Sequence, residues 1–134
     1  MLGTYEGNDL TGIGTSNDRP DVLDIDHLMA QALHDADLAR EVLAMFLEQS
    51  GDMLRIVREA GGAMDRRNAA HRLKGSARAV GAFRVAAASE SLEFLPEDAD
   101  EPSLLDRIAA LHASVAEARS AIAARLAGAD ARGL

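Results

Sequence analysis

The sequence predicts an all-α protein, an antiparallel up-down four-helix bundle with a short additional N-terminal helix. Apolar residues recur at helical spacing in four long segments, no segment alternates like a half-buried strand, and glycine or proline separates the segments. Amphipathic helices joined by short loops can bury their apolar faces only against one another. The chain of 134 residues is long enough to form one such domain without disulfides or a structural metal.

The helical domain is expected to span residues 21–128. Residues 1–20 contain four glycines, several acidic and polar groups and no apolar stretch, which is typical of a flexible N-terminal tail. Residues 129–134 are expected to form a short C-terminal tail.

The first two helices follow this tail. A short helix is expected over 25–34, with Asp24 near its start. A long helix is expected over 38–60, with Asp37 as its N-cap and the glycine pair at 61–62 ending it.

The next two helices form a hairpin. The spacing of alanine, leucine and valine predicts a helix over 65–80, in which Asp65 is the candidate N-cap and Gly81 marks a tight turn. A helix over 82–95 then ends before Pro96, because a proline disfavours helical geometry in the residue that precedes it.

The last predicted helix has the longest series of apolar residues at helical spacing in the chain. Residues 97–101 are largely acidic and predict a solvated loop, after which Pro102 or Ser103 begins the helix. Its apolar residues keep helical spacing until Gly128, where the helix is expected to end.

His71 is the most informative residue for function. Counted at about 100° per residue, the apolar positions of the 65–80 helix centre roughly 140° away from it, so the imidazole is expected to face solvent. Lys74, the only lysine beside 13 arginines, follows one turn later, and Gly75 is an unusual choice inside a helix because it costs about 1 kcal/mol relative to alanine. An exposed lysine there would contribute less than about 0.5 kcal/mol to stability.

The surface around His71 is expected to be basic. Its neighbours within about 60° on the helix are Arg67, Asn68, Lys74, Gly75 and Arg78. From 65 to 84 the chain carries six basic residues and one acid, a balance of +5, whereas its total charge of -8 leaves -13 for the remainder. A solvated helix face is the alternative explanation, but the coincidence with His71 favours an acidic docking partner. A neutral imidazole beside positive charge can accept and donate a phosphoryl group.

Several other functions lack support. No Glu-x-x-His or His-x-x-x-His pattern predicts a metal site, no Gly-Lys-Ser or Gly-Lys-Thr loop predicts bound ATP, and the chain has no cysteine nucleophile. The negative charge and the aromatic content of 3% argue against nucleic-acid binding. Without an apolar segment of about 18 residues or a secretory signal, a cytoplasmic protein is expected. We also expect the protein to be a monomer.

The run HRLKGSARAVGA at 71–82, with a Leu-Glu pair at 92–93, resembles histidine-containing phosphotransfer (HPt) domains, and the helical layout over 21–128 agrees. The resemblance implies that His71 is the phosphoacceptor, that Lys74 stabilises the phosphoryl group, and that Gly75 permits close approach of a receiver domain.

The family resemblance also implies partners, and the sequence differs from the family pattern at Glu93. It implies a sensor or hybrid histidine kinase and receiver domains as partners, with Mg²⁺ bound by the receiver and no cofactor bound by this chain. Many relatives have a glutamine where Glu93 stands, and a carboxylate there would disfavour a nearby phosphate unless it pointed away.

The function expected from sequence is therefore a stand-alone phosphorelay intermediate, a phosphocarrier without a kinase site of its own. One alternative is a phosphorylation-independent module that docks on a receiver or kinase and inhibits it. A second is a fragment of a larger sensor kinase, although Met1 and the lack of a catalytic domain favour a separate protein.

Overall fold

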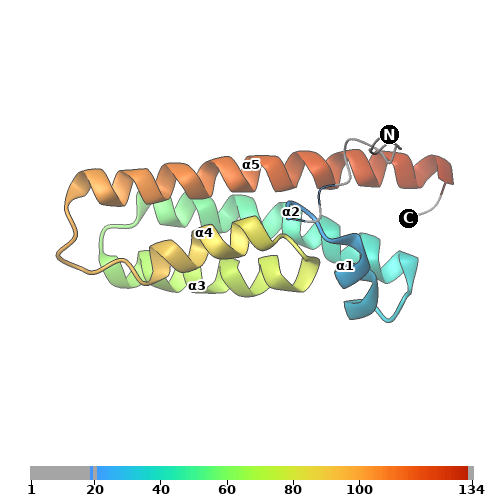
Figure 1. The fold of residues 1–134 in the computed structure, drawn as a ribbon, viewed down its shortest axis with the longest axis horizontal. Coiled ribbons are helices and arrows are strands. Elements are labelled where there is room, and N and C mark those ends of the chain that lie inside the picture. The colour runs from blue at the N-terminus through green and yellow to red at the C-terminus, as the bar shows by residue number, and fades with distance from the viewer. Residues whose placement is uncertain (1–18, 20, 133–134) are drawn as a thin grey trace, which may run out of the picture.

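The computed structural model describes Arg19 and residues 21–132, which form five α-helices and no strand within that part of the chain. They are α1 (Ile25–Gln31), α2 (Ala36–Glu59), α3 (Ala63–Val80), α4 (Phe83–Glu93) and α5 (Glu101–Arg132). The four longer helices run alternately up and down, and α1 lies across one end of them (Figure 1). The predicted all-α bundle with a short additional helix is confirmed.

The core lies between the four long helices. α3 packs against both α2 and α4, and these two in turn contact α5. The predicted apolar face of α3 is buried, as are the facing positions of the other helices, among them Leu43, Phe46, Leu73, Val80, Leu92, Leu111, Val115 and Ile122. At about 25 cal/mol per Å² of apolar surface, this burial is the main force that holds the bundle together.

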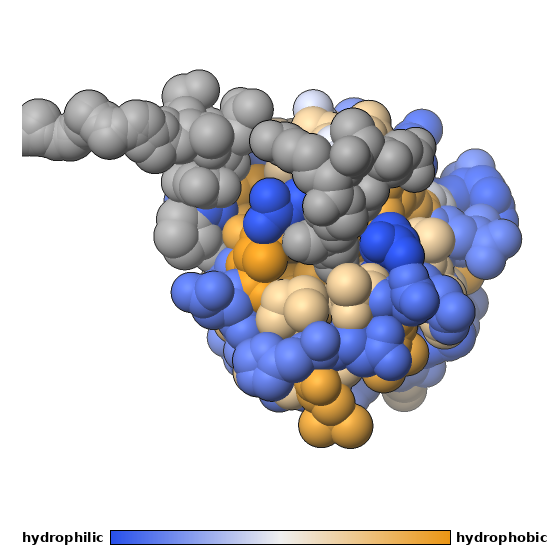
Figure 2. All heavy atoms as spheres, turned by 90° about the vertical axis from the view of Figure 1, so that its right-hand side faces the viewer, coloured by the Kyte–Doolittle hydropathy of each residue, from blue (hydrophilic) through white to orange (hydrophobic). Residues whose placement is uncertain are grey.

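Helix α1 is shorter than the sequence predicted. It ends at Gln31, and the chain then turns through Leu33 and His34, which both adopt left-handed backbone angles with φ of 56° and 60°. The turn carries Leu33 away from the predicted apolar face and leaves it 82% exposed. Viewed from this end, hydrophilic residues of the described surface surround a central area of higher hydropathy (Figure 2).

The N-cap of α2 differs by two residues from the prediction. The side chain of Asp35, and not that of Asp37, accepts hydrogen bonds from the backbone N–H groups of residues 37 and 38. Because the turn after α1 is tight, the chain reaches the helix earlier, and Asp37 lies in the first turn, where its charge favours the helix N-terminus.

The ends of α3 and α5 also differ from expectation. Gly62 precedes α3 without a side-chain cap, so Asp65 lies within the first turn and is not the cap. Asp100 accepts a hydrogen bond of 2.8 Å from the backbone N–H of Ser103, which starts α5 at Glu101. The helix continues beyond Gly128 to Arg132, so the segment predicted as a C-terminal tail begins as helix.

The predicted N-terminal tail lies outside the described residues except for Arg19. That residue is attached to the bundle, since its carbonyl accepts hydrogen bonds of 2.9 Å from the N–H groups of Val22 and Leu23. Its guanidinium lies 3.6 Å from the carboxylates of both Asp21 and Glu117.

The turn between α3 and α4 joins three parts of the fold. Gly81 ends α3 in the left-handed conformation with φ of 81°, and its carbonyl accepts a hydrogen bond of 2.9 Å from the N–H of Asp24. The carbonyl of Asp21 accepts from the N–H of Arg84 at 3.1 Å, which satisfies a donor in the first turn of α4, a helix without a side-chain cap. This turn therefore fixes both α1 and the start of α4, the helix that faces His71.

Candidate functional site

His71 lies in the middle of α3 with its side chain 66% exposed. The residues that share its turns, Ala70 and Leu73, are completely buried, which fixes the rotation of the helix and turns the imidazole outward. The predicted orientation of His71 is therefore confirmed.

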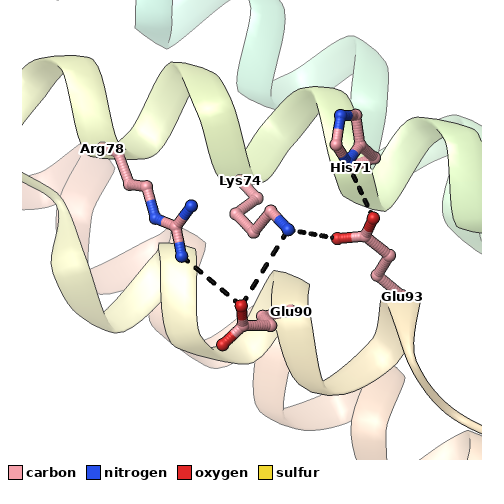
Figure 3. A network of polar contacts seen from close by, with 5 residues as sticks. All are labelled: His71, Lys74, Arg78, Glu90 and Glu93. Atoms are coloured by element: carbon pink, nitrogen blue, oxygen red, sulfur yellow. Dashed lines mark hydrogen bonds and ion pairs between the residues drawn. The ribbon is translucent and has the colours of Figure 1, made fainter.

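Glu93, at the end of α4, connects His71 to Lys74. One carboxylate oxygen, Oε2, lies 2.7 Å from His71 Nδ1, and the other, Oε1, lies 2.7 Å from Lys74 Nζ (Figure 3). The carboxylate thus points at the imidazole, and its charge is shared between His71 and Lys74.

Lys74 is not the exposed cation that the sequence predicted. The residue is only 8% exposed, and its ammonium lies 3.9 Å from Glu90 Oε2 in addition to its close contact with Glu93. The ring of Phe94 also lies beside the ammonium, with its centroid 5.1 Å from Lys74 Nζ. Lys74 points from α3 toward α4, where it meets these acidic and aromatic side chains.

The charge of Glu93 determines which ring nitrogen of His71 is free. Burial alone raises the pKa of Glu93, but the hydrogen bonds from Lys74 and His71 outweigh it and hold that pKa below its ordinary value. At neutral pH the carboxylate is therefore ionised and can only accept a hydrogen bond, so Nδ1 of the imidazole must donate. In the neutral imidazole the lone pair is then on Nε2, which points away from Glu93 (Figure 3).

The basic surface expected around His71 is largely neutralised. Arg78 lies 3.4 Å from Glu90, and Arg67 lies 3.3 Å from Glu97, so acidic residues of α4 and the loop after it compensate the arginines of α3. The local charge balance of +5 counted along the sequence does not describe the folded surface. A docking partner meets paired charges rather than a strongly basic face.

Gly75 and Asn68 are exposed on the same side of α3 as His71. A Cβ atom added to Gly75 would meet no atom within 4 Å, so packing inside the bundle does not explain the glycine. Asn68 borders a surface pocket of about 350 Å³ between α2 and α3, which Met53, Ile56 and Arg72 also line.

Two residues of this site were missed by sequence reasoning, Glu90 and Phe94. Both are on α4 or at its end, one turn or less from Glu93. The spacing of Glu90 and Glu93, three residues apart, indicates one helix face and was the signal available in the sequence. Their contact with Lys74 depends on how α4 is rotated against α3, which the spacing alone does not give.

No group of three or more histidine, cysteine, aspartate or glutamate side chains in the described part of the chain is arranged to hold a metal ion. Among the described helices, none has the length and apolar content needed to cross a membrane.

Comparisons with known proteins identify a family and a similar fold. The family model of the Hpt domain matches residues 41–121, more than half of the chain. Among solved structures, the chain is similar to the HPT domain of the Hpt sensor hybrid histidine kinase from Shewanella, with a TM-score of 0.68 and 21% identity. That match covers 82% of this chain and 97% of the other. No curated protein matches the chain.

Proposed function

This chain belongs to the Hpt domain family, a family of phosphotransfer modules in two-component signalling, and on that premise we propose that it is a phosphorelay intermediate. His71 accepts a phosphoryl group from the aspartyl phosphate of one receiver domain and passes it to another. The observation that carries this proposal is an exposed imidazole whose Nδ1 is held by Glu93 while Nε2 remains free.

The proposed reaction is an in-line displacement at phosphorus. The Nε2 lone pair of neutral His71 attacks the phosphorus atom of the receiver's aspartyl phosphate, the N–P bond forms, and the bond between phosphorus and the aspartate oxygen breaks. The aspartate leaves as a carboxylate, and the receiver supplies the Mg²⁺ that offsets charge on the phosphoryl oxygens. Onward transfer is the same displacement in reverse, on a second receiver.

Glu93 assists this reaction by its position behind the ring. When Nε2 gains the phosphoryl group, the imidazole keeps its proton on Nδ1 and becomes positively charged, and the carboxylate at 2.7 Å stabilises that charge. The same hydrogen bond fixes the tautomer and orientation of the neutral ring before the reaction.

The cations contribute in different ways. Lys74 contacts Glu93 and keeps the carboxylate in place, so its main effect on His71 is exerted through that residue. Arg78 is 55% exposed and its pair with Glu90 is 3.4 Å long, so breaking this surface pair costs little, about 1 kcal/mol or less. Arg78 is thus the cation that can turn toward the phosphoryl oxygens.

Phosphoryl exchange with receivers tests this function. Mixed with a phosphorylated cognate receiver, the chain is expected to remove the receiver's phosphoryl group and to become labelled itself, and a second receiver should then take up the label. Tight binding to receivers without any transfer would contradict the carrier function and would support the inhibitory binding module.

Gly75 is expected to be the point where the receiver comes closest to α3. Gly75→Ala should stabilise the bundle by up to about 1 kcal/mol, because alanine is the better helix former and its Cβ finds open space. Gly75→Leu should slow phosphoryl exchange, because its side chain projects beside His71. Chemical denaturation and transfer kinetics measure the two effects separately. Exchange at the wild-type rate in Gly75→Leu would exclude close approach at this position.

A further inference from the structure

Phe94 follows Glu93 directly and ends α4 with two-thirds of its surface, 67%, exposed to solvent. The chain contains only three phenylalanines, and Phe46, by contrast, is completely buried in the core. An aromatic side chain that remains this exposed gains little from burial. The contact that its ring makes with the protein is therefore of more interest than the area it buries.

The ring of Phe94 faces the ammonium of Lys74, with 5.1 Å between its centroid and Nζ. This distance is within the range of about 6 Å in which the negative face of an aromatic ring attracts a cation. Lys74 also has two carboxylates within reach, Glu93 at 2.7 Å and Glu90 at 3.9 Å. Phe94 follows Glu93 directly in the chain. The attraction between its ring and the ammonium of Lys74 therefore favours a position of that ammonium beside the Glu93 carboxylate.

We infer that Phe94 is a positioning residue for phosphoryl transfer, whose ring holds the ammonium of Lys74 against Glu93 and so fixes the carboxylate that orients His71. The inference rests on the proposed function, because it assigns Phe94 a role in the reaction of His71. It adds a residue at a position outside the HRLKGSARAVGA run.

Apart from His71, Lys74 is the main cation beside Glu93, because the neighbouring arginines pair with other groups. Arg78 of α3 is engaged with Glu90, and Arg67 of α3 is engaged with Glu97. Arg107 of α5 is engaged with Ser91 of α4, because it donates to the carbonyl and hydroxyl oxygens of that residue at 2.7 Å. Without the aromatic ring, Lys74 gains freedom to move toward Glu90, and Glu93 loses part of its compensating charge.

Three variants test the inference. Phe94→Leu keeps an apolar side chain but removes the aromatic face, and Phe94→Trp restores it in a stronger form. Phe83→Leu is the matched control, because Phe83 is the half-exposed phenylalanine at the other end of α4, where it packs on His27 at 5.0 Å and not on the site. The measurements are the carboxyl titration of Glu93 by NMR and the rate of transfer as a function of the concentration of phosphorylated receiver.

In Phe94→Leu the titration of Glu93 should move to higher pH, because Lys74 binds the ionised form less firmly. The maximal rate of transfer should fall about two- to fivefold, the range expected from a cation–π contact at an exposed site. KM should not change. Phe94→Trp should restore the wild-type titration and rate, and Phe83→Leu should leave both unchanged.

Two results would overturn the inference. An unchanged Glu93 titration in Phe94→Leu would show that the ring does not act on the carboxylate, and a rise in KM alone would make Phe94 a partner contact instead. If the wild-type chain exchanged no phosphoryl group at all, the proposed function would fail. The carboxyl titration would still test the contact of Phe94 with Lys74 and Glu93.

Discussion

Gly81→Ala is expected to reduce the free energy of unfolding by about 2–4 kcal/mol, the largest effect of any single substitution considered for the fold. The left-handed backbone of Gly81, with φ of 81°, costs an alanine about 1 kcal/mol or more. In addition, a Cβ atom at this position would lie 2.6 Å from the carbonyl oxygen of Asp24, a backbone atom that is itself fixed at the start of α1.

The steric clash at Gly81 should loosen the attachment of α1 and the start of α4. Urea denaturation followed by circular dichroism measures the loss of stability. Gly61→Ala is the matched control, because its Cβ would meet no atom within 4 Å and its backbone is not left-handed, and it should stay within about 1 kcal/mol of wild type. Equal stabilities of the two variants would contradict the described turn.

Lys74→Ala is expected to reduce stability by about 1–2 kcal/mol, because it leaves the partly buried carboxylate of Glu93 without its nearest cation. This exceeds the value of less than about 0.5 kcal/mol that applies to an exposed lysine. Transfer to His71 should also slow, since Glu93 is then held less firmly. Arg78→Ala is the control for stability alone, and loss of its exposed pair with Glu90 should change stability by less than about 0.5 kcal/mol.

The stabilising effect of Lys74 should depend on pH in a defined direction. The folded-state pKa of Glu93 is lowered, so the ion pair contributes fully above the ordinary pKa of a glutamate and is lost as pH falls through the lowered value. The stability difference between wild type and Lys74→Ala should therefore narrow toward acid pH. A difference that is constant between pH 7 and pH 3 would show that Glu93 does not carry the effect.

The orientation of His71 could be predicted from the sequence because it depends on one helix alone. Helical periodicity places the buried residues of α3 on one side and the imidazole on the other. The surroundings of Lys74 could not be predicted in this way. Lys74 lies near the border of the exposed face, and whether it meets solvent or Glu93 depends on how α4 packs against α3.

The N-cap of α2 could not be predicted from the sequence either. Asp35 and Asp37 are both good N-cap residues, and the choice between them depends on the left-handed turn at Leu33 and His34. Leucine rarely adopts this conformation, so the residue type at Leu33 gives no local signal for the turn. Helix α1, which precedes the turn, contacts α2 and α3. Such tertiary contacts cannot be predicted from the periodicity of apolar residues.

The central claim is that His71 carries the phosphoryl group, and intact mass spectrometry after incubation with a phosphorylated receiver tests it most directly. Wild type is expected to gain the mass of one phosphoryl group, which acid treatment removes, as is typical of phosphohistidine. His71→Gln should gain none while it keeps the helical circular dichroism spectrum of the wild type. An undiminished mass gain in His71→Gln would contradict the assignment and would place the phosphoryl group on another residue.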